Sequence, residues 1–277
     1  PMLLWNGIGL ALVSGFATWG RLKAPVPSGI GEALDWIGCV TRPNPINVQI
    51  SFLRDLFLCM CAAPLLARLP TRGLWLAWGV ALAWSIAIVP WPILLRPPIL
   101  LFFVTGMLAR RAGLAERIAT WPLWACTLPY LLLVPVKIWL SADAAGWWMS
   151  HVAAANAIDL PMRFAAALAL WRVALALAPG RLGRLLLLRG ERYAFLLFCC
   201  HLVLIWLIGP VIGHAVGKLG APGYPFYLLL QPLLALGATV LVALALERVS
   251  RPLAGLLSGG RLSGQRPAPL PKPAASA

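Results

Sequence analysis

Residues 193–213 read YAFLLFCCHLVLIWLIGPVIG, and this stretch decides the fold class. It contains no Asp, Glu, Lys or Arg. A helix needs roughly 20 largely apolar residues to cross the hydrocarbon core of a bilayer. The stretch therefore predicts a transmembrane helix.

Further apolar segments lie on both sides of this one, and the whole chain is 61% hydrophobic and only 11% charged. A soluble domain averages about 45–50% apolar and about 25% charged residues. The composition therefore predicts an all-α, polytopic transmembrane helix bundle with about eight spans. The other segments run over about 2–20, 50–67, 74–91, 97–109, 121–140, 160–178 and 224–246. Segment 97–109 is short and follows Pro97-Pro98, so we expect it to be tilted.

Two regions do not have the composition of a spanning helix. Residues 21–49 carry four prolines, which exclude one regular helix through the region. The tail from Ser258 is rich in Gly, Pro, Ser and Ala, and this composition is typical of disorder. We expect one membrane domain over residues 1–257 and a disordered cytoplasmic tail over 258–277.

The chain has a net charge of +15, which in a soluble protein would suggest nucleic-acid binding. Here the basic residues lie mostly in short loops between apolar segments, so we expect membrane lipid and no nucleic acid as a partner. They concentrate in alternate loops, and the positive-inside rule then places both ends of the chain in the cytoplasm. The basic residues that indicate these loops include Arg68, Arg72, Arg110, Arg111, Arg117, Arg181, Arg184, Arg189 and Arg192.

Five of the six cysteines lie in apolar segments, where a free cysteine behaves as a small hydrophobic residue. Neither Cys59-Met-Cys61 nor Cys199-Cys200 has the spacing of a zinc site. We therefore expect neither a bound metal nor a disulfide framework.

The adjacent charges Arg54 and Asp55 lie about one turn into the segment 50–67. A charge at this depth is costly without a partner. Neighbouring residues of a helix point about 100° apart, so we expect two separate partners and no mutual pair. The alternative is an interfacial pair that reaches the outer membrane surface.

Other polar residues occur in or beside the last three predicted spans. Arg172 lies deeper in its span than Arg163, which could extend to the outer surface, and Glu247 closes the final span. His201 could be a proton carrier or a hydrogen-bonded packing residue. Asp143 and Asp159 flank an outer loop, where solvated acids are the ordinary interpretation, although they could also line an entrance for a polar acceptor.

None of the P-loop, GxSxG, HExxH and dinucleotide-binding motifs is present. Four stretches, in order, resemble the integral-membrane acyltransferases of family three, which O-acylate bacterial surface glycans. They are PMLLWNGIGLAL at 1–12, ISFLRDLFLCMCAAPLL at 50–66, LLFFVTGMLARR at 100–111, and RYAFLLFCCHLVLIW at 192–206 followed by ALERVSRPL at 245–253.

This resemblance implies a multi-pass enzyme of the bacterial inner (plasma) membrane. Such an enzyme moves an acetyl or similar short acyl group from acyl-coenzyme A to a glycan or lipid-linked sugar acceptor, with no bound cofactor. Arg54 and Asp55 are then the candidate catalytic residues. The candidate substrate-binding residues are Arg172, His201 and Glu247.

The family has ten helices, and its first helix carries an arginine followed about eleven positions later by a histidine, the presumed base. The resemblance begins at the third helix, so it implies that the base lies upstream of Pro1 and that residues 1–277 alone are inactive. His201 does not inherit this role. Two other classes stay open: a glycan or lipid transporter or flippase subunit, and a non-catalytic membrane subunit.

The basic loops predict a topology that reporter fusions can check. Fusions placed after Arg111, Trp147 and Arg189 are expected to report inside, outside and inside, because each arginine-rich loop stays in the cytoplasm. A reversed pattern, or three reporters on one side, would contradict the predicted topology.

Overall fold

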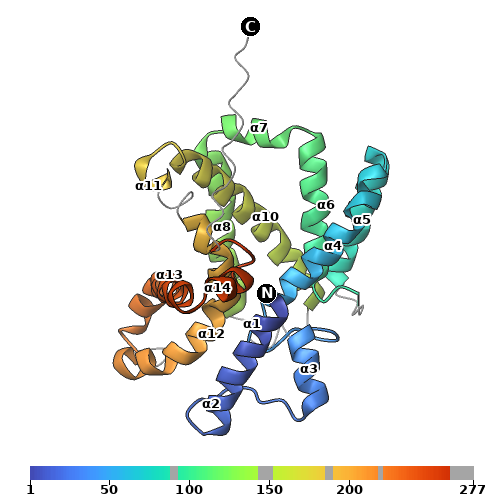
Figure 1. The fold of residues 1–277 in the computed structure, drawn as a ribbon. Coiled ribbons are helices and arrows are strands. Elements are labelled where there is room, and N and C mark those ends of the chain that lie inside the picture. The colour runs from blue at the N-terminus through green and yellow to red at the C-terminus, as the bar shows by residue number, and fades with distance from the viewer. Residues whose placement is uncertain (88–92, 143–151, 185–189, 218–220, 263–277) are drawn as a thin grey trace. The chain divides into compact units, whose positions relative to one another are not determined.

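The computed structural model describes residues 1–87, 93–142, 152–184, 190–217 and 221–262, and this part of the chain is helical without strands. Each of the eight predicted segments contains a helix (Figure 1). The first is built from α1 (Met2–Gly9), the π-helix η1 (Leu10–Ser14) and α2 (Gly15–Thr18). The others are α4 (Ile50–Arg68), α5 (Thr71–Ala87), α6 (Pro97–Arg111), α8 (Leu123–Ala142), α10 (Val152–Leu177), α12 (Gly190–Val216) and α13 (Tyr224–Val249).

The number of spans is smaller by strict criteria than the eight predicted. Within the described residues, four helices are long and apolar enough to cross a membrane: α4, α10, α12 and α13. A fifth span is possible if α6 and the short α7 (Leu114–Thr120), which meet at an 80° bend, count as one. The all-α bundle and its multi-pass membrane character are confirmed, whereas the count of eight is not.

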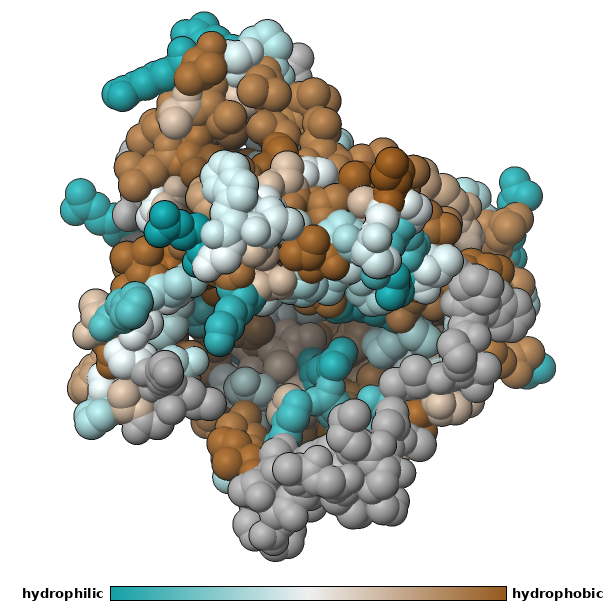
Figure 2. All heavy atoms as spheres, turned by 90° about the horizontal axis from the view of Figure 1, so that it is seen from below, coloured by the Kyte–Doolittle hydropathy of each residue, from teal (hydrophilic) through white to brown (hydrophobic). Residues whose placement is uncertain are grey.

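Large apolar side chains lie on the surface of these helices, as expected for lipid contact. Leu76, Leu229 and Leu241 are among the most exposed. Figure 2 shows one face of the molecule, on which hydrophobic residues cover wide areas and hydrophilic residues form separate patches. Because lipid tails are themselves apolar, such a surface is stable in a bilayer and would aggregate in water.

The chain forms two compact units. The sequence predicted one membrane domain over residues 1–257. Unit 1 comprises Pro1–Val26 and the chain from Gly190, and unit 2 comprises Pro27–Arg189. Unit 2 also contains α3 (Ile30–Gly38) and α11 (Arg181–Arg184), and unit 1 also contains α14 (Arg251–Leu257).

Helix α6 is the centre of unit 2. Its side chains Leu101, Val104 and Leu108 are buried against α4, α5 and α10. The Trp78 indole of α5 donates a hydrogen bond of 2.9 Å to the Thr105 hydroxyl of α6. This pairing satisfies two polar groups inside an apolar bundle, where an unsatisfied group would be costly.

Both ends of α6 follow from its sequence. Pro97 and Pro98 occupy the first turn of the helix. Proline has no backbone N–H, and in the first turn an N–H would have no acceptor within the helix, so no hydrogen bond is lost. Gly113, with φ of +60°, turns the chain into α7. Glycine adopts this left-handed conformation without the steric cost of a Cβ atom. The prediction of a short helix therefore holds, with the added feature of a sharp bend after it.

The proline-rich region 21–49 contains one short helix, α3, that the sequence did not predict. It ends at Cys39, whose φ of 50° is left-handed, before Pro43. Asn44 organises the chain after it: its amide donates to Trp36 O, and its side-chain oxygen accepts from the N–H groups of Ile46 and Asn47. These bonds lead the chain into α4.

Unit 1 brings the beginning of the chain to its last helix. The Trp5 indole donates a hydrogen bond of 2.9 Å to Leu257 O. Ser258 and Leu262 are buried, and the Ser258 hydroxyl accepts from the Leu262 N–H at 3.0 Å. The predicted disordered tail is therefore wrong for residues 258–262, which fold back after α14. Residues 263–277 lie outside the described part of the chain.

Asn44→Ala is expected to destabilise the protein by about 2–3 kcal/mol, because it leaves two buried N–H groups and one carbonyl without their partner. Thermal unfolding in detergent and membrane abundance measure the change. Asn156→Ala is the matched control, because the Asn156 amide makes one long bond of 3.4 Å to Ile86 O. Equal losses for the two variants would contradict the role given to Asn44.

Candidate active site

Arg54 and Asp55 lie in the first turns of α4 and form an ion pair. The Arg54 Nη1 donates to Asp55 Oδ1 at 2.7 Å. The prediction that they do not pair with each other is wrong, because the long arginine side chain folds back across the angle between neighbouring positions. Both residues also contact the connection into α6, at Ile93 for Arg54 and at Leu95 and Arg96 for Asp55, so the two separate partners that were predicted lie largely on one segment.

Asp55 has no exposed surface and accepts hydrogen bonds from three donors. Besides Arg54, the backbone N–H groups of Leu95 and Arg96 donate to its carboxylate at 3.3 and 2.7 Å. Both belong to the connection that enters α6. The carboxylate therefore joins α4 to α6 and satisfies two N–H groups that the start of a helix leaves without partners.

The two arginines that contact this carboxylate, Arg54 by its side chain and Arg96 by its backbone N–H, both extend their guanidinium groups to backbone carbonyls. Arg54 donates to Ile93 O at 3.2 Å and lies 3.5 Å from Val40 O. Arg96 donates from Nη2 to Val48 O at 2.9 Å. The Arg54 side chain keeps 17% of its surface exposed, so a ligand could contact it, whereas Asp55 is inaccessible.

A second charged group joins α8 to α10. Asp159 of α10 accepts from Lys137 of α8 and from Arg163, one turn along α10, at 2.6 Å. The expectation that Asp159 is a solvated loop acid is wrong, because α10 begins earlier than predicted and includes it. Arg163 pairs with this acid. Asp143 lies outside the described residues.

A third group lies on α3, outside the spans. Arg42 pairs with Glu32 at 2.6 Å and with Asp35 at 3.4 Å. The pKa of Glu32 is lowered, first by hydrogen bonds from the Ser28 side chain and backbone and then by Arg42. Burial acts to raise the pKa of Asp35, but hydrogen bonds from Thr41 and the charge of Arg42 outweigh it, so this pKa is also lowered.

The opposite end of unit 2 carries exposed arginines around α7. These are Arg68 at the end of α4, Arg72 in α5, Arg110 and Arg111 at the end of α6, and Arg117 in α7. The Arg111 side chain donates to Ala67 O at 2.8 Å. Figure 1 shows α7 at the end of unit 2 opposite to α3.

Arg172, a predicted substrate-binding residue, belongs to this second end. Its Nε donates to Trp121 O at 2.8 Å, the carbonyl that follows α7. The side chain therefore holds the end of α7 against α10. It lies nine residues, or about 14 Å of helix, from Arg163. The structure thus places Arg172 away from the Arg54–Asp55 pair.

His201 belongs to α12 of unit 1. Its Nδ1 lies 2.8 Å from Leu197 O, one turn back in the same helix. Because a carbonyl only accepts, Nδ1 carries the hydrogen and Nε2 is left as the other functional nitrogen. The ring also contacts Phe198 edge-on. These contacts favour the hydrogen-bonded packing interpretation over the proton carrier.

Glu247, near the end of α13, pairs with Arg192 at the start of α12. This ion pair joins the two long helices of unit 1 at one end. Arg192 also lies 5.3 Å from the centroid of the Tyr193 ring. His201 is nine residues from Arg192, about 14 Å along α12, so Glu247 and His201 do not share one site.

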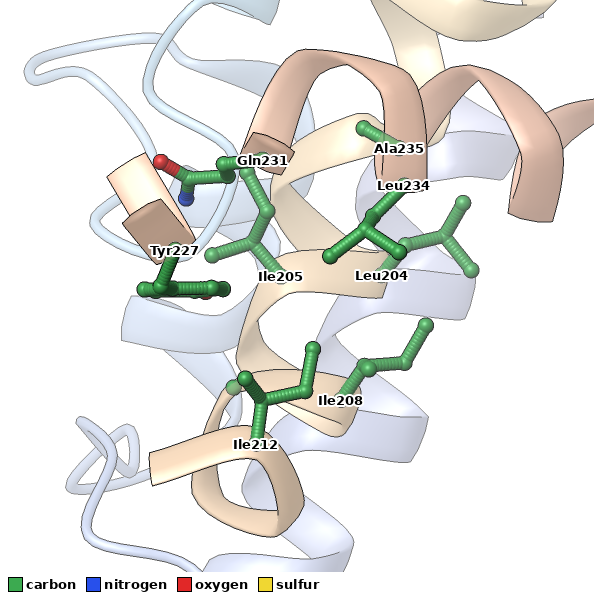
Figure 3. Close-up of a pocket in the computed structure, with 9 residues that line it drawn as sticks. Leu204, Ile205, Ile208, Ile212, Tyr227, Gln231, Leu234 and Ala235 are labelled. Atoms are coloured by element: carbon green, nitrogen blue, oxygen red, sulfur yellow. The ribbon is translucent and has the colours of Figure 1, made fainter. Parts of the chain in front are cut away.

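A shallow groove lies between α12 and α13 (Figure 3). Its walls are almost entirely apolar, with Tyr227 and Gln231 as the polar side chains that line it. Acyl transfer needs groups that move protons or stabilise developing charge. The groove therefore offers a surface for an apolar chain and no set of catalytic groups.

The described residues contain no group of three His, Cys, Asp or Glu side chains arranged for a metal ion. All six cysteines are free thiols in this structure.

Comparison with protein families agrees with the all-helical membrane architecture described above. The family model described as acyltransferase domain matches residues 1–248. The chain belongs to this acyltransferase family. It is therefore an enzyme, and the resemblance to integral-membrane acyltransferases of family three is confirmed.

One similar protein is the succinoglycan biosynthesis protein ExoH of Rhizobium meliloti (strain 1021). The two sequences are 27% identical over 287 residues, an alignment that covers 100% of this chain and 74% of the relative. No solved structure matches the chain. Family membership favours the enzyme over the transporter and the non-catalytic subunit.

Sequence reasoning missed Arg96 and Lys137 as parts of these charged groups. Arg96 follows a short irregular segment, and its partner Asp55 lies 41 residues away. Lys137 pairs with an acid 22 residues away. The one available signal was that each carboxylate in a span needs a cation, which makes every basic residue at the same membrane depth a candidate.

Asp55→Ala is expected to lower stability by about 3–5 kcal/mol, because three donors lose a buried charged acceptor. Arg54→Ala is expected to lower stability by a smaller amount, since the Asp55 carboxylate keeps two backbone donors. Membrane abundance and thermal unfolding of the two variants, with the Arg54→Ala/Asp55→Asn double variant alongside, test this order. Equal loss, or a larger loss for Arg54→Ala, would contradict it.

Proposed function

We propose that the protein transfers an acetyl or similar short acyl group from a coenzyme A thioester to a glycan hydroxyl at the surface of the bacterial inner membrane. The family match over residues 1–248 carries this proposal. The name of the relative ExoH concerns succinoglycan biosynthesis, which favours a polysaccharide or its lipid-linked precursor as acceptor.

The exposed arginines at the α7 end of unit 2 suit an anionic donor. Five arginines gather there, and Glu116 is the acidic residue of α7. Phosphate groups bind guanidinium groups through paired, charge-assisted hydrogen bonds. The positive-inside rule places this end in the cytoplasm, where coenzyme A thioesters are made.

The reaction forms one C–O bond and breaks one C–S bond. The acceptor hydroxyl oxygen attacks the thioester carbonyl carbon, and a general base takes the hydroxyl proton as the bond forms. Negative charge develops on the carbonyl oxygen before the thiolate leaves. The proton then returns to the thiolate, so that the products are an O-acyl glycan and free coenzyme A.

Arg54 is the residue of this chain best suited to contact the reacting groups. Its guanidinium is fixed by Asp55 and Ile93 O, yet part of it remains exposed. A donor held in place before reaction stabilises developing negative charge without the cost of reorganisation. Asp55, fully buried with both oxygens engaged, acts as a positioning residue for Arg54 and Arg96.

Arg54→Ala in the complete protein is expected to lower the rate of acyl transfer by roughly 10²-fold or more, because a fixed donor to the developing charge is lost. Arg54→Lys is expected to fail as well, since an ammonium group cannot reproduce the planar, two-pronged geometry. Release of free thiol from acetyl-coenzyme A with extracted glycan acceptor measures the rate.

Membrane abundance is measured beside activity, so that a folding defect is recognised. Arg42→Ala is the matched control: this arginine is exposed and its two acidic partners lie on α3. Wild-type transfer by Arg54→Ala would remove this residue from the site. Transfer lost equally in Arg42→Ala would show that any arginine in this part of unit 2 has the same effect.

A further inference from the structure

One end of unit 2 holds more positive than negative charge among its described, interacting residues. Two carboxylates, Asp55 and Asp159, form ion pairs with three of the cations at this end, and a fourth cation contacts Asp55 through its backbone N–H. The cations are Arg54, Arg96, Lys137 and Arg163. They come from α4, α8, α10 and the connection into α6, and we call them the four-cation cluster.

Asp159 cannot neutralise both of its partners. It pairs with Lys137 and with Arg163, so one positive charge is left over. The Arg163 side chain is 54% exposed. Its Nε and Nη2 face Asp159, and its Nη1 makes no hydrogen bond to a described residue. One edge of this guanidinium is therefore available to a ligand.

The leftover charge of Arg163 lies on a helix that packs against α6, which Arg96 precedes: Phe164 of α10 contacts Phe102 of α6, with ring centroids 4.4 Å apart. Arg163 repels the Arg96 guanidinium, while Asp55 attracts it. Asp55 contacts Arg96 through the backbone N–H, and its ion pair is made within α4. Two cations that repel each other are stabilised by an anion that binds between or beside them.

The position of Arg163 along its helix makes this excess charge unusual. The span in α10 begins at Ala154, so Arg163 lies about 14 Å along it. Charges at such depth face a water-filled space or a partner and commonly mark the path of a polar substrate. Arg163, which is exposed and shares its carboxylate within a candidate span, has the features of such a position.

Arg42 is an arginine of the same unit whose charge is neutralised, and it serves as a comparison for Arg163. Its side chain is also 54% exposed, but Glu32 and Asp35 both pair with it. Arg42 thus has two carboxylates to itself, whereas Arg163 shares one carboxylate with Lys137. Since their exposure is equal, the two positions differ in charge balance and not in accessibility.

We propose that the four-cation cluster binds an anionic group of the acceptor and so fixes the sugar hydroxyl for acylation. This inference rests on the proposed function. The shared chemistry is an oxyanion of more than one charge, which guanidinium pairs bind bidentately. It has two sources: the diphosphate of a lipid-linked glycan, or carboxylates on the glycan itself.

The test measures binding without catalysis. Purified full-length protein in phosphatidylcholine nanodiscs is titrated calorimetrically with inorganic pyrophosphate, with trigalacturonate and with neutral maltotriose. Wild type is expected to bind one of the two anions and not maltotriose. Arg163→Gln is expected to weaken that binding at least tenfold, Arg163→Lys less, and Arg42→Gln less than twofold. The preferred anion identifies the source.

Acyl-transfer kinetics separate this inference from the proposed function. Arg163→Gln is expected to raise the KM for the acceptor about tenfold while the KM for acetyl-coenzyme A stays unchanged. Anion binding that depends on Arg163 in a protein without acyl transfer would overturn the proposed function alone. Normal acyl transfer with no anion binding, or equal effects of the Arg163→Gln and Arg42→Gln variants, would overturn the anion site alone.

Discussion

A carboxylate at membrane depth is expensive unless donors replace its water, and Asp55 obtains three donors from two different parts of the chain. Two of them are the N–H groups of Leu95 and Arg96, at the entry to α6. Helix α6 in turn supplies the buried centre of unit 2, through Leu101 and Val104. The position of one buried charge therefore fixes how α4 and α6 meet, and with them the guanidinium that we assign to the reaction.

The charged residues of unit 2 form two groups, which differ in their exposure and in how strongly their charges are screened. At the α7 end the arginines are exposed, so water and lipid headgroups screen them and a phosphorylated donor can displace those partners. At the other end Asp55 pairs with Arg54, and Asp159 is shared between Lys137 and Arg163. There the screening is weaker, and the balance between cations and carboxylates decides what binds. The function that we propose requires two such binding regions, one for the donor and one for the acceptor.

Unit 1 contributes little charge to this scheme. Its long helices α12 and α13 pack through apolar and small residues, with a hydrogen bond between Cys200 and Thr239 and one ion pair at the end. His201 is hydrogen-bonded within its own helix. The apolar groove between these helices fits a lipid tail better than a sugar or a nucleotide (Figure 3). The family match includes unit 1 as far as residue 248.

The sequence by itself determined the all-α membrane class and the position of each apolar segment, and it identified Arg54 and Asp55 as charges that need partners, because hydropathy and the cost of charge at depth are local properties. It also determined the family, through motifs carried by short stretches. It did not determine that Arg54 and Asp55 pair, that Asp159 lies inside a helix, or that Arg96 and Lys137 complete the two charged groups. These depend on which helix ends meet, and the partners are 22 and 41 residues apart. Tertiary packing alone decided them, since no periodicity within one segment records which other segment it will touch.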